Sequence, residues 1–163
     1  APRPICFVRQ RTSRKIPSPQ KEELQRKWLS TVQEKRGSQH LSRIKLDISL
    51  APAFFVGSRQ DQTILARLRF GTNNLNASKS RWSLNVSNLC ECGEIKTARH
   101  YLLHCNRYNE SRSSMLNKIR TFWKGFINEE FLLGGATVKL DKTYWEIVVA
   151  AVASFVRSTK RNI

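Results

Sequence analysis

The sequence predicts a mainly α-helical domain with an embedded Cys/His cluster and a basic, irregular amino-terminal arm. Three observations support this prediction. Apolar residues recur at helical spacing in several segments that begin and end with capping residues. Three of the four cysteines and two of the three histidines fall within residues 88–108. Residues 1–46 hold twelve Lys and Arg but only three acidic residues. We therefore divide the chain into an arm or linker at residues 1–17 and a helical domain at residues 18–163.

The charge of the chain is strongly unbalanced. Its 163 residues include 29 Lys and Arg against 12 Asp and Glu, which gives a formal net charge of +17. An apolar content of 40%, with four Trp and eight Phe, predicts that most of the chain folds. A domain so basic repels itself unless it meets a polyanion, and nucleic acid is the commonest one. A merely soluble basic surface is the alternative, since net charge alone does not define a fold or a partner.

The first helix is expected to begin at Ser18 and Pro19. Ser caps exposed amides, and Pro is tolerated in the first turn. Up to Gly37, the helix carries an apolar stripe that we expect to pack in the core, formed by Leu24, Trp28, Leu29 and Val32. Residues 38–55 have mixed periodicity and are expected to form a loop with short extended pieces.

A second helix is predicted by a start signal and a stop signal. Ser58 and Asp61 resemble a capping box, and Gly71 supplies the stop. Between them, the helix has one apolar face, formed by Ile64, Leu65 and Leu68. Its arginines are expected to lie off that face: Arg59, Arg67 and Arg69.

Two further helices are expected after a polar loop at 71–82. Apolar spacing from Met115 to Phe126 predicts a helix that ends near residues 125–128, followed by a turn at 132–137. Residues 142–158 predict a last, apolar helix in the centre of the core. Its apolar run is too short to span a bilayer and contains Glu146, so no membrane contact is expected. No secretory signal is recognisable at the start of the sequence.

The Cys/His cluster has the spacing C-x-C-x7-H-x4-C, formed by Cys90, Cys92, His100 and Cys105. Thiolate sulfur and imidazole nitrogen are zinc ligands, and four of them predict a closed, structural site with one Zn²⁺, a CCHC zinc knuckle at residues 88–108. Gly93 allows a tight turn around the first pair. Thr97 is expected to cap a short helix that carries the second pair.

Two other interpretations of the cluster stay open. His104 could replace Cys105 as the fourth ligand, because His-x3-His on one helical face is a familiar zinc pair. We favour Cys105, since a thiolate binds more strongly than a second imidazole. Alternatively, the cysteines are buried without a metal. A hydrolytic zinc would need an open position and a general base. No such pattern, phosphate loop or aspartate pair is present, so we expect this chain alone not to be an enzyme.

Two segments around the cluster resemble a known family. "ILARLRFGTNNLN" (64–76) and "LCECGEIKTARHYLLHCNRYNESRSSML" (89–116) resemble the carboxyl-terminal segment of polyproteins from non-LTR (LINE-type) retrotransposons. There, a Leu-Arg-x-Gly stretch precedes a Cys-x-Cys-Gly, His, Cys zinc knuckle and a Cys-x-x-Tyr…Arg tail. "LQRKWLSTV" (24–32) and "ASFVRSTKR" (153–161) extend the resemblance. Phe70 departs from it, because Thr more usually precedes the glycine, and no RNase H carboxylates are recognisable upstream.

This resemblance implies a module of a reverse transcriptase polyprotein, whose parent would be an RNA-directed DNA polymerase. The expected partners are RNA and/or DNA and the remainder of the parent polyprotein, in the nucleus and in cytoplasmic ribonucleoprotein. The four cluster residues match the family's zinc ligands, and Arg67 and Arg69 match the basic helix before them. A zinc-braced module that docks to the parent polymerase is the first alternative. A metallonuclease that uses His100 or His104 is the second.

Candidate nucleic-acid contacts lie in three places. Zinc knuckles typically present cations to phosphates and aromatic rings to unstacked bases. The arm offers Arg11, Arg14 and Lys15, and the second helix offers Arg67 and Arg69. The cluster is flanked by Lys79, Arg81, Trp82, Lys96, Arg99 and Arg107. Tyr101 and Tyr108 also flank it, although burial in the core is the simpler expectation for each aromatic residue.

Overall fold

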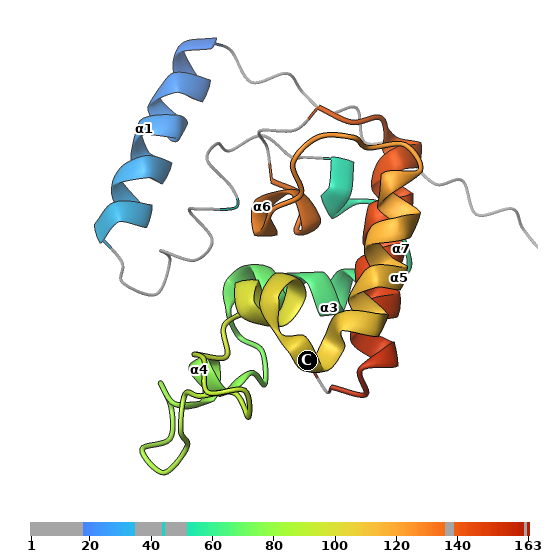
Figure 1. Ribbon diagram of the computed structural model, residues 1–163. Helices are drawn as coiled ribbons and strands as arrows, with labels where there is room; N and C mark the ends of the chain where they lie inside the picture. Colours follow the sequence, from blue (N-terminus) through green and yellow to red (C-terminus); the bar gives the residue numbers. More distant parts are fainter. Residues whose placement is uncertain (1–17, 35–43, 45–51, 136–138, 162) are drawn as a thin grey trace, which may run out of the picture.

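Figure 1 shows the computed structural model of the chain, which describes residues 18–34, 44, 52–135, 139–161 and 163. The expected arm at 1–17, with Arg11, Arg14 and Lys15, lies outside the described residues. In chain order the elements are α1 (Ser18–Glu34), η2 (Pro52–Phe54), α3 (Arg59–Phe70), α4 (Asn76–Lys79), η3 (His100–His104), η4 (Asn106–Tyr108), α5 (Asn109–Arg120), α6 (Glu129–Leu132) and α7 (Lys142–Ser158). Within the described ranges the only extended pairing is a bridge between Leu89 and Ile95. The mainly α prediction is confirmed.

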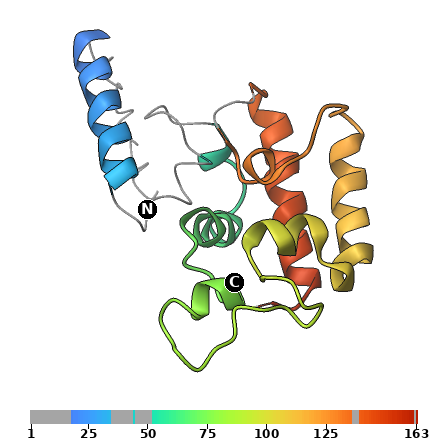
Figure 2. The same cartoon turned by 60° about the vertical axis from the view of Figure 1, so that its left-hand side comes forward.

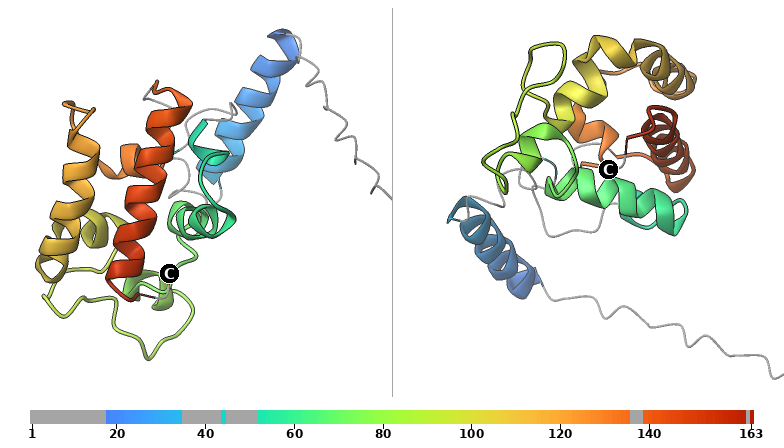
Figure 3. Two further views of the ribbon diagram at one scale, coloured as in Figure 1. Left: turned by 90° about the vertical axis from the view of Figure 1, so that its right-hand side faces the viewer. Right: turned by 90° about the horizontal axis from the view of Figure 1, so that it is seen from below.

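Helix α7 lies at the centre of the domain, as its sequence predicts. Helix α5 lies antiparallel beside it, and α3 crosses against it (Figures 1 and 3). Its buried positions share one broad face, a little more than half of the circumference: Trp145, Val148, Val149, Ala151, Val152, Ala153, Phe155 and Val156. Burying each large apolar side chain contributes about 1.5–3 kcal/mol, so this helix supplies much of the hydrophobic stabilisation. None of the helices in the described ranges is long and apolar enough to cross a membrane.

The ends of α3 are formed by the residues that the sequence indicates. The Ser58 hydroxyl accepts a hydrogen bond from the Asp61 amide at 3.1 Å, and the Asp61 carboxylate accepts one from the Ser58 amide at 3.1 Å. Gly71 adopts a left-handed φ of 64° and ends the helix. The Asp61 carboxylate also accepts a hydrogen bond from Arg157 at the end of α7. The capping box therefore fixes α3 against the central helix.

Arg69 is buried in the core, which corrects its assignment to a nucleic-acid contact. Its side chain is 1% exposed, and its guanidinium lies 4.1 Å from the centre of the Phe54 ring. It donates hydrogen bonds to the Leu133 carbonyl at 2.6 Å and to the Ala53 carbonyl at 3.4 Å. Burial lowers the pKa of this guanidinium to about 10. Arg69 thus joins η2, α3 and the end of α6 and cannot reach a phosphate.

Other elements also differ from the prediction. Leu24 and Leu29 of α1 are exposed and Trp28 is half-buried, so the two leucines do not pack in the core. Helix α5 ends at Arg120, and Phe126 beyond it is exposed. The short helix α4 lies within the expected polar loop, and α6 was not anticipated. One- and two-turn helices such as these have too few residues to show an apolar period.

We predict that Arg69→Met destabilises the domain by about 2–4 kcal/mol, because the Leu133 carbonyl loses its donor and the Ala53 carbonyl and the Gln62 side-chain oxygen each lose a hydrogen bond. Chemical denaturation followed by circular dichroism measures this change. Arg59→Met, at an exposed position of the same helix, should change the free energy of unfolding by less than about 0.5 kcal/mol. Equal stability of the two variants would contradict the structural role of Arg69.

Candidate metal centre

Residues 88–96 form a tight hairpin that carries the first two cysteines. The Cys90 amide donates to the Glu94 carbonyl at 2.7 Å, and the Lys96 amide donates to the Asn88 carbonyl at 2.9 Å. Gly93 occupies the turn with a φ of +89°, a conformation that favours glycine. The hairpin projects from the helical body together with α4 (Figures 1 and 2). The backbone thus turns back on itself and brings Cys90 and Cys92 together.

The second pair of residues comes from η3, which has a wider turn than an α-helix. The Thr97 hydroxyl caps this segment by accepting a hydrogen bond from the His100 amide at 3.1 Å. The Cys105 amide donates to the His100 carbonyl at 2.8 Å, across five residues. In an α-helix, residues five apart point about 140° away from each other, whereas the wider π turn brings them closer to one side. The π turn therefore places the side chains of His100 and Cys105 close to the same side of η3.

Four side chains converge on one point. The ligand atoms of Cys90, Cys92, His100 and Cys105 all lie within 4.8 Å of one another. The Cys90 and Cys105 sulfurs are 3.6 Å apart, and the Cys92 sulfur lies 3.2 Å from Nε2 of His100. A tetrahedron with metal–sulfur bonds of about 2.3 Å has sulfur–sulfur edges of about 3.8 Å, close to this spacing. The cluster can therefore hold a metal ion. His104 is exposed and lies outside it.

The thiols of the cluster differ in acidity. Burial alone would raise the pKa of the Cys90 thiol. Hydrogen bonds from the Cys92 amide and from the His100 and Cys105 side chains outweigh this effect and lower the pKa to about 6. Burial raises the pKa of the Cys105 thiol to about 11, and the neighbouring Cys90 contributes in the same direction. The cluster therefore favours one thiolate next to a neutral thiol, and a bound cation would favour ionisation of the rest.

Residues around the cluster hold its backbone and its imidazole. Arg112 of α5 is buried, and its guanidinium donates to the Leu102 carbonyl at 3.0 Å and to the Cys105 carbonyl at 2.5 Å. The Glu94 carboxylate lies 2.7 Å from Nδ1 of His100, although without the alignment of a hydrogen bond. Sequence reasoning assigned no role to Arg112. The only signal was the arginine in the Cys-x-x-Tyr…Arg tail of the resemblance.

Lys96 and two tyrosines are buried, so the candidate surface is smaller than predicted. The Lys96 side chain is 1% exposed, and its ammonium lies 5.9 Å from the centre of the Tyr108 ring. Its assignment as a phosphate contact is therefore wrong. Tyr101 and Tyr108 pack edge-to-face with each other and against Phe155 of α7. These rings anchor η3 and η4 to the core and have no face free for a base.

The other predicted contacts remain at the surface. Lys79 and Arg99 are exposed, and Trp82 is 83% exposed. Arg81 is exposed and bonds to the Gly71 carbonyl at 2.6 Å. Arg67 donates to the Ile163 carbonyl at 2.6 Å, and Arg107 is paired with Glu91. On this surface the charge of Arg107 is therefore compensated by a carboxylate, whereas Arg81 bonds only to neutral acceptors.

No match was found for the chain among the protein families, the curated proteins or the solved structures with which it was compared. The site is therefore interpreted from its own geometry. Three thiols and one imidazole that meet at metal-ligand distances make this segment a candidate metal centre.

We predict that Cys105→Ser loses the bound metal, because a serine hydroxyl is a poor ligand for soft cations. Metal content per chain, measured by elemental mass spectrometry on purified protein, tests this. His104→Ala is the matched control and should keep the wild-type content, since His104 lies outside the cluster. Metal retention in Cys105→Ser together with its loss in His104→Ala would show that the imidazole is the fourth ligand.

We further predict that Arg112→Met lowers metal affinity about 10–100-fold without removing a ligand, because it releases the Cys105 carbonyl and loosens the ligand geometry. Competition with a chromophoric chelator measures this affinity. Lys118→Met, at an exposed position of the same helix, should bind metal as the wild type does. If Arg112→Met also retained wild-type affinity, Arg112 would not position the ligand.

Proposed function

We propose that the chain is a nucleic-acid-binding module whose Cys3His cluster holds one structural zinc ion. Cys90, Cys92, His100 and Cys105 would bind it, and sulfur with imidazole is the donor set that zinc prefers in closed sites. Bound zinc would hold the hairpin and η3 together and would leave no ligand position for a water. The chain's own surface residues then make the contacts with nucleic acid.

The observation that supports this function best is the uncompensated charge near the hairpin. Lys79, Arg81 and Arg99 have no carboxylate within ion-pair distance among the described residues. Trp82 directly follows Arg81 in sequence and is 83% exposed. Uncompensated cations beside an exposed aromatic ring suit a strand that presents both phosphates and unstacked bases. The net charge of +17 favours the same partner.

The resemblance to LINE-type polyproteins gives this function a context. As the carboxyl-terminal part of a reverse transcriptase, the module would help to hold template RNA or target DNA. Its partners would be that nucleic acid and the remainder of the parent polyprotein, in nuclear and cytoplasmic ribonucleoprotein. Catalysis would reside elsewhere in the parent protein.

A protein-docking module is the second candidate, and one observation favours it. In addition to Trp82, the projecting segment (residues 80–96) exposes three apolar side chains: Leu84, Leu89 and Ile95. Leu89 and Ile95 are neighbours across the bridge, and adjoining exposed apolar side chains are typical of protein interfaces. Salt separates the candidates, since nucleic-acid affinity falls linearly with salt on a log–log scale, and an apolar interface responds weakly.

We predict that the double variant Lys79→Gln, Arg99→Gln weakens binding to single-stranded RNA and lowers the salt slope by about 1.4, because each neutralised phosphate contributes about 0.7. Fluorescence anisotropy over a salt series measures the slope. Lys139→Gln, Lys142→Gln is the control, because Lys142 begins α7 at the end of the domain away from the hairpin (Figure 1). An equal loss in both variants would indicate non-specific charge, and a salt-independent affinity would favour the docking module.

A further inference from the structure

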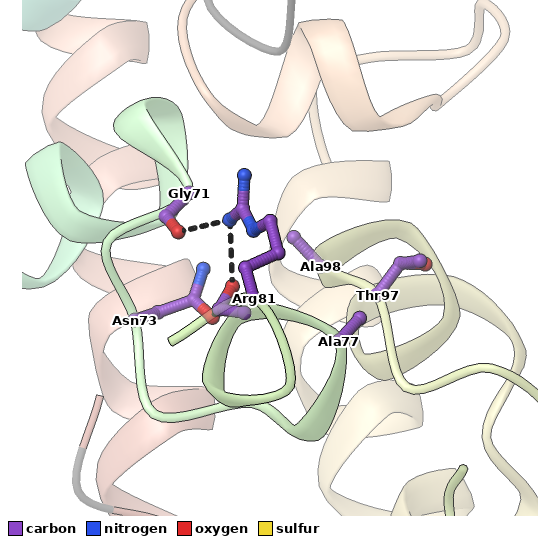
Figure 4. A pocket seen from close by; sticks show the side chains of 7 residues that line it. Gly71, Asn73, Ala77, Arg81, Thr97 and Ala98 are labelled. Atoms are coloured by element: carbon purple, nitrogen blue, oxygen red, sulfur yellow. Dashed lines mark hydrogen bonds between the residues drawn. The ribbon is translucent and has the colours of Figure 1, made fainter. Parts of the chain in front are cut away.

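A cavity of about 260 Å³ lies beside the candidate metal centre. Its walls come from the loop after α3, from α4 with the residues that follow it, and from the segment that leads into η3. Figure 4 shows Arg81 between the carbonyl of Gly71 and the side of the cavity formed by Thr97 and Ala98. Ala77 contributes a further apolar wall. None of the four cluster residues lines the cavity, and Ala98 connects it to the hydrophobic core.

The Gly71, Asn73 and Thr97 oxygens that line the cavity each already accept at least one hydrogen bond. The Gly71 carbonyl accepts from Arg81, and the Asn73 side-chain oxygen accepts from the Leu75 amide and from the Ser78 hydroxyl. The Thr97 hydroxyl oxygen accepts from the His100 amide. Donors remain, because Arg81 has further N–H groups and the Asn73 amide nitrogen makes only a long bond of 3.5 Å. Asn73 is 6% exposed, so an acceptor that enters the cavity would satisfy a buried donor.

Arg81 carries a positive charge into this donor-rich cavity. Nη2 is held by two neutral acceptors, the Gly71 carbonyl at 2.6 Å and the Ser78 hydroxyl at 3.3 Å. No carboxylate of the described residues lies within ion-pair distance of the Arg81 guanidinium. These bonds fix the guanidinium and leave its charge uncompensated. A pre-oriented, uncompensated guanidinium favours an anionic acceptor, and phosphate is the most suitable one.

We propose that this cavity binds one nucleotide unit, with its phosphate on Arg81 and its sugar or base between Ala77 and Ala98. The inference rests on the proposed function and names a site within it. The volume exceeds what a phosphate alone needs, and the two alanine methyl groups suit the apolar face of a sugar or base. Trp82, the residue after Arg81, is placed in sequence to stack on the next base of a strand.

The candidate metal centre supports one wall of this cavity. The Ala77 amide donates to the Lys96 carbonyl at 3.3 Å, and the Asn76 side chain donates to the Leu89 carbonyl. Thr97 lines the cavity and also caps the segment that carries His100. Metal loss should therefore open the cavity, which links metal content to nucleotide affinity.

Nuclear magnetic resonance of the metal-loaded chain tests the proposal. Uridine 5′-monophosphate, uridine, inorganic phosphate and a single-stranded oligouridine are the probes. We expect the monophosphate and the oligonucleotide to shift the Arg81 Nε–H, the Asn73 side-chain amide and the methyl signals of Ala77 and Ala98. Arg81→Gln should weaken monophosphate binding about tenfold, the loss of one charged hydrogen bond. Arg59→Gln should stay within about twofold of the wild type.

Two further results decide the nature of the ligand. Ala98→Leu fills the cavity without changing charge and should also weaken monophosphate binding, which keeps the test informative if Arg81→Gln does not fold. Inorganic phosphate that binds as tightly as the monophosphate would overturn the nucleotide assignment. Unmoved Asn73 and Ala98 signals at saturating monophosphate would overturn the cavity altogether.

The same titrations separate this inference from the proposed function. If the oligonucleotide binds by anisotropy and the cavity signals do not move, the cavity proposal fails and nucleic-acid binding stands. If the monophosphate moves the cavity signals and no oligonucleotide binds, the cavity proposal stands and the nucleic-acid function fails.

Discussion

Residues 80–96 depend on the convergence of three thiols and one imidazole, because this segment has almost no core of its own. Apart from Cys90 and Lys96, its side chains are exposed or partly exposed, so hydrophobic burial contributes little to its folding. The rings of Tyr101 and Tyr108 attach η3 and η4 to the helical body, Arg112 bonds to the Cys105 carbonyl, and Glu91 of the hairpin lies 3.7 Å from Arg161. A metal ion that joins the hairpin to η3 would replace the missing core, as structural metals do in small domains. The surface cations and the cavity would then depend on that centre.

The arginines of this chain serve two different purposes. Arg69 and Arg112 are buried and donate to backbone carbonyls where helices meet turns, so they stabilise the fold. Arg81 and Arg99 are exposed, and the described residues offer them no carboxylate partner. The net charge of +17 therefore overstates what a partner can reach. A nucleic acid would meet only the exposed part of it, which makes position on the surface more informative than the total.

Local signals predicted local structure well. Ser58, Asp61 and Gly71 define the ends of α3, because caps depend on a few neighbouring residues. The apolar run of residues 142–158 also predicted the central helix α7, because a helix with few polar residues has to be buried. The cluster was predicted by spacing, but the spacing alone left His104 open. The choice of Cys105 depends on a π turn, which no periodicity of α-helical sequence indicates.

Long-range contacts were the part that the sequence could not predict. Arg69 is predicted at the surface by its helical position and by the resemblance, and Lys96 by its residue type, but their burial depends on carbonyls and rings contributed by distant segments. The stripe of α1 has the right period for a core helix, yet Leu24 and Leu29 stay exposed. Period shows that a helix is amphipathic and does not show what covers it.

Hydrogen exchange of the metal-loaded and the chelator-treated chain tests the central claim most directly. If the metal centre organises the projecting segment, chelation should remove protection from the amides of Cys90, Lys96 and Cys105 and from Ala77 at the cavity wall. Protection in α5 and α7 should persist, because their stability comes from apolar burial. Unchanged protection at Cys90 and Lys96 after complete metal removal would contradict the claim, and so would a uniform loss across all helices.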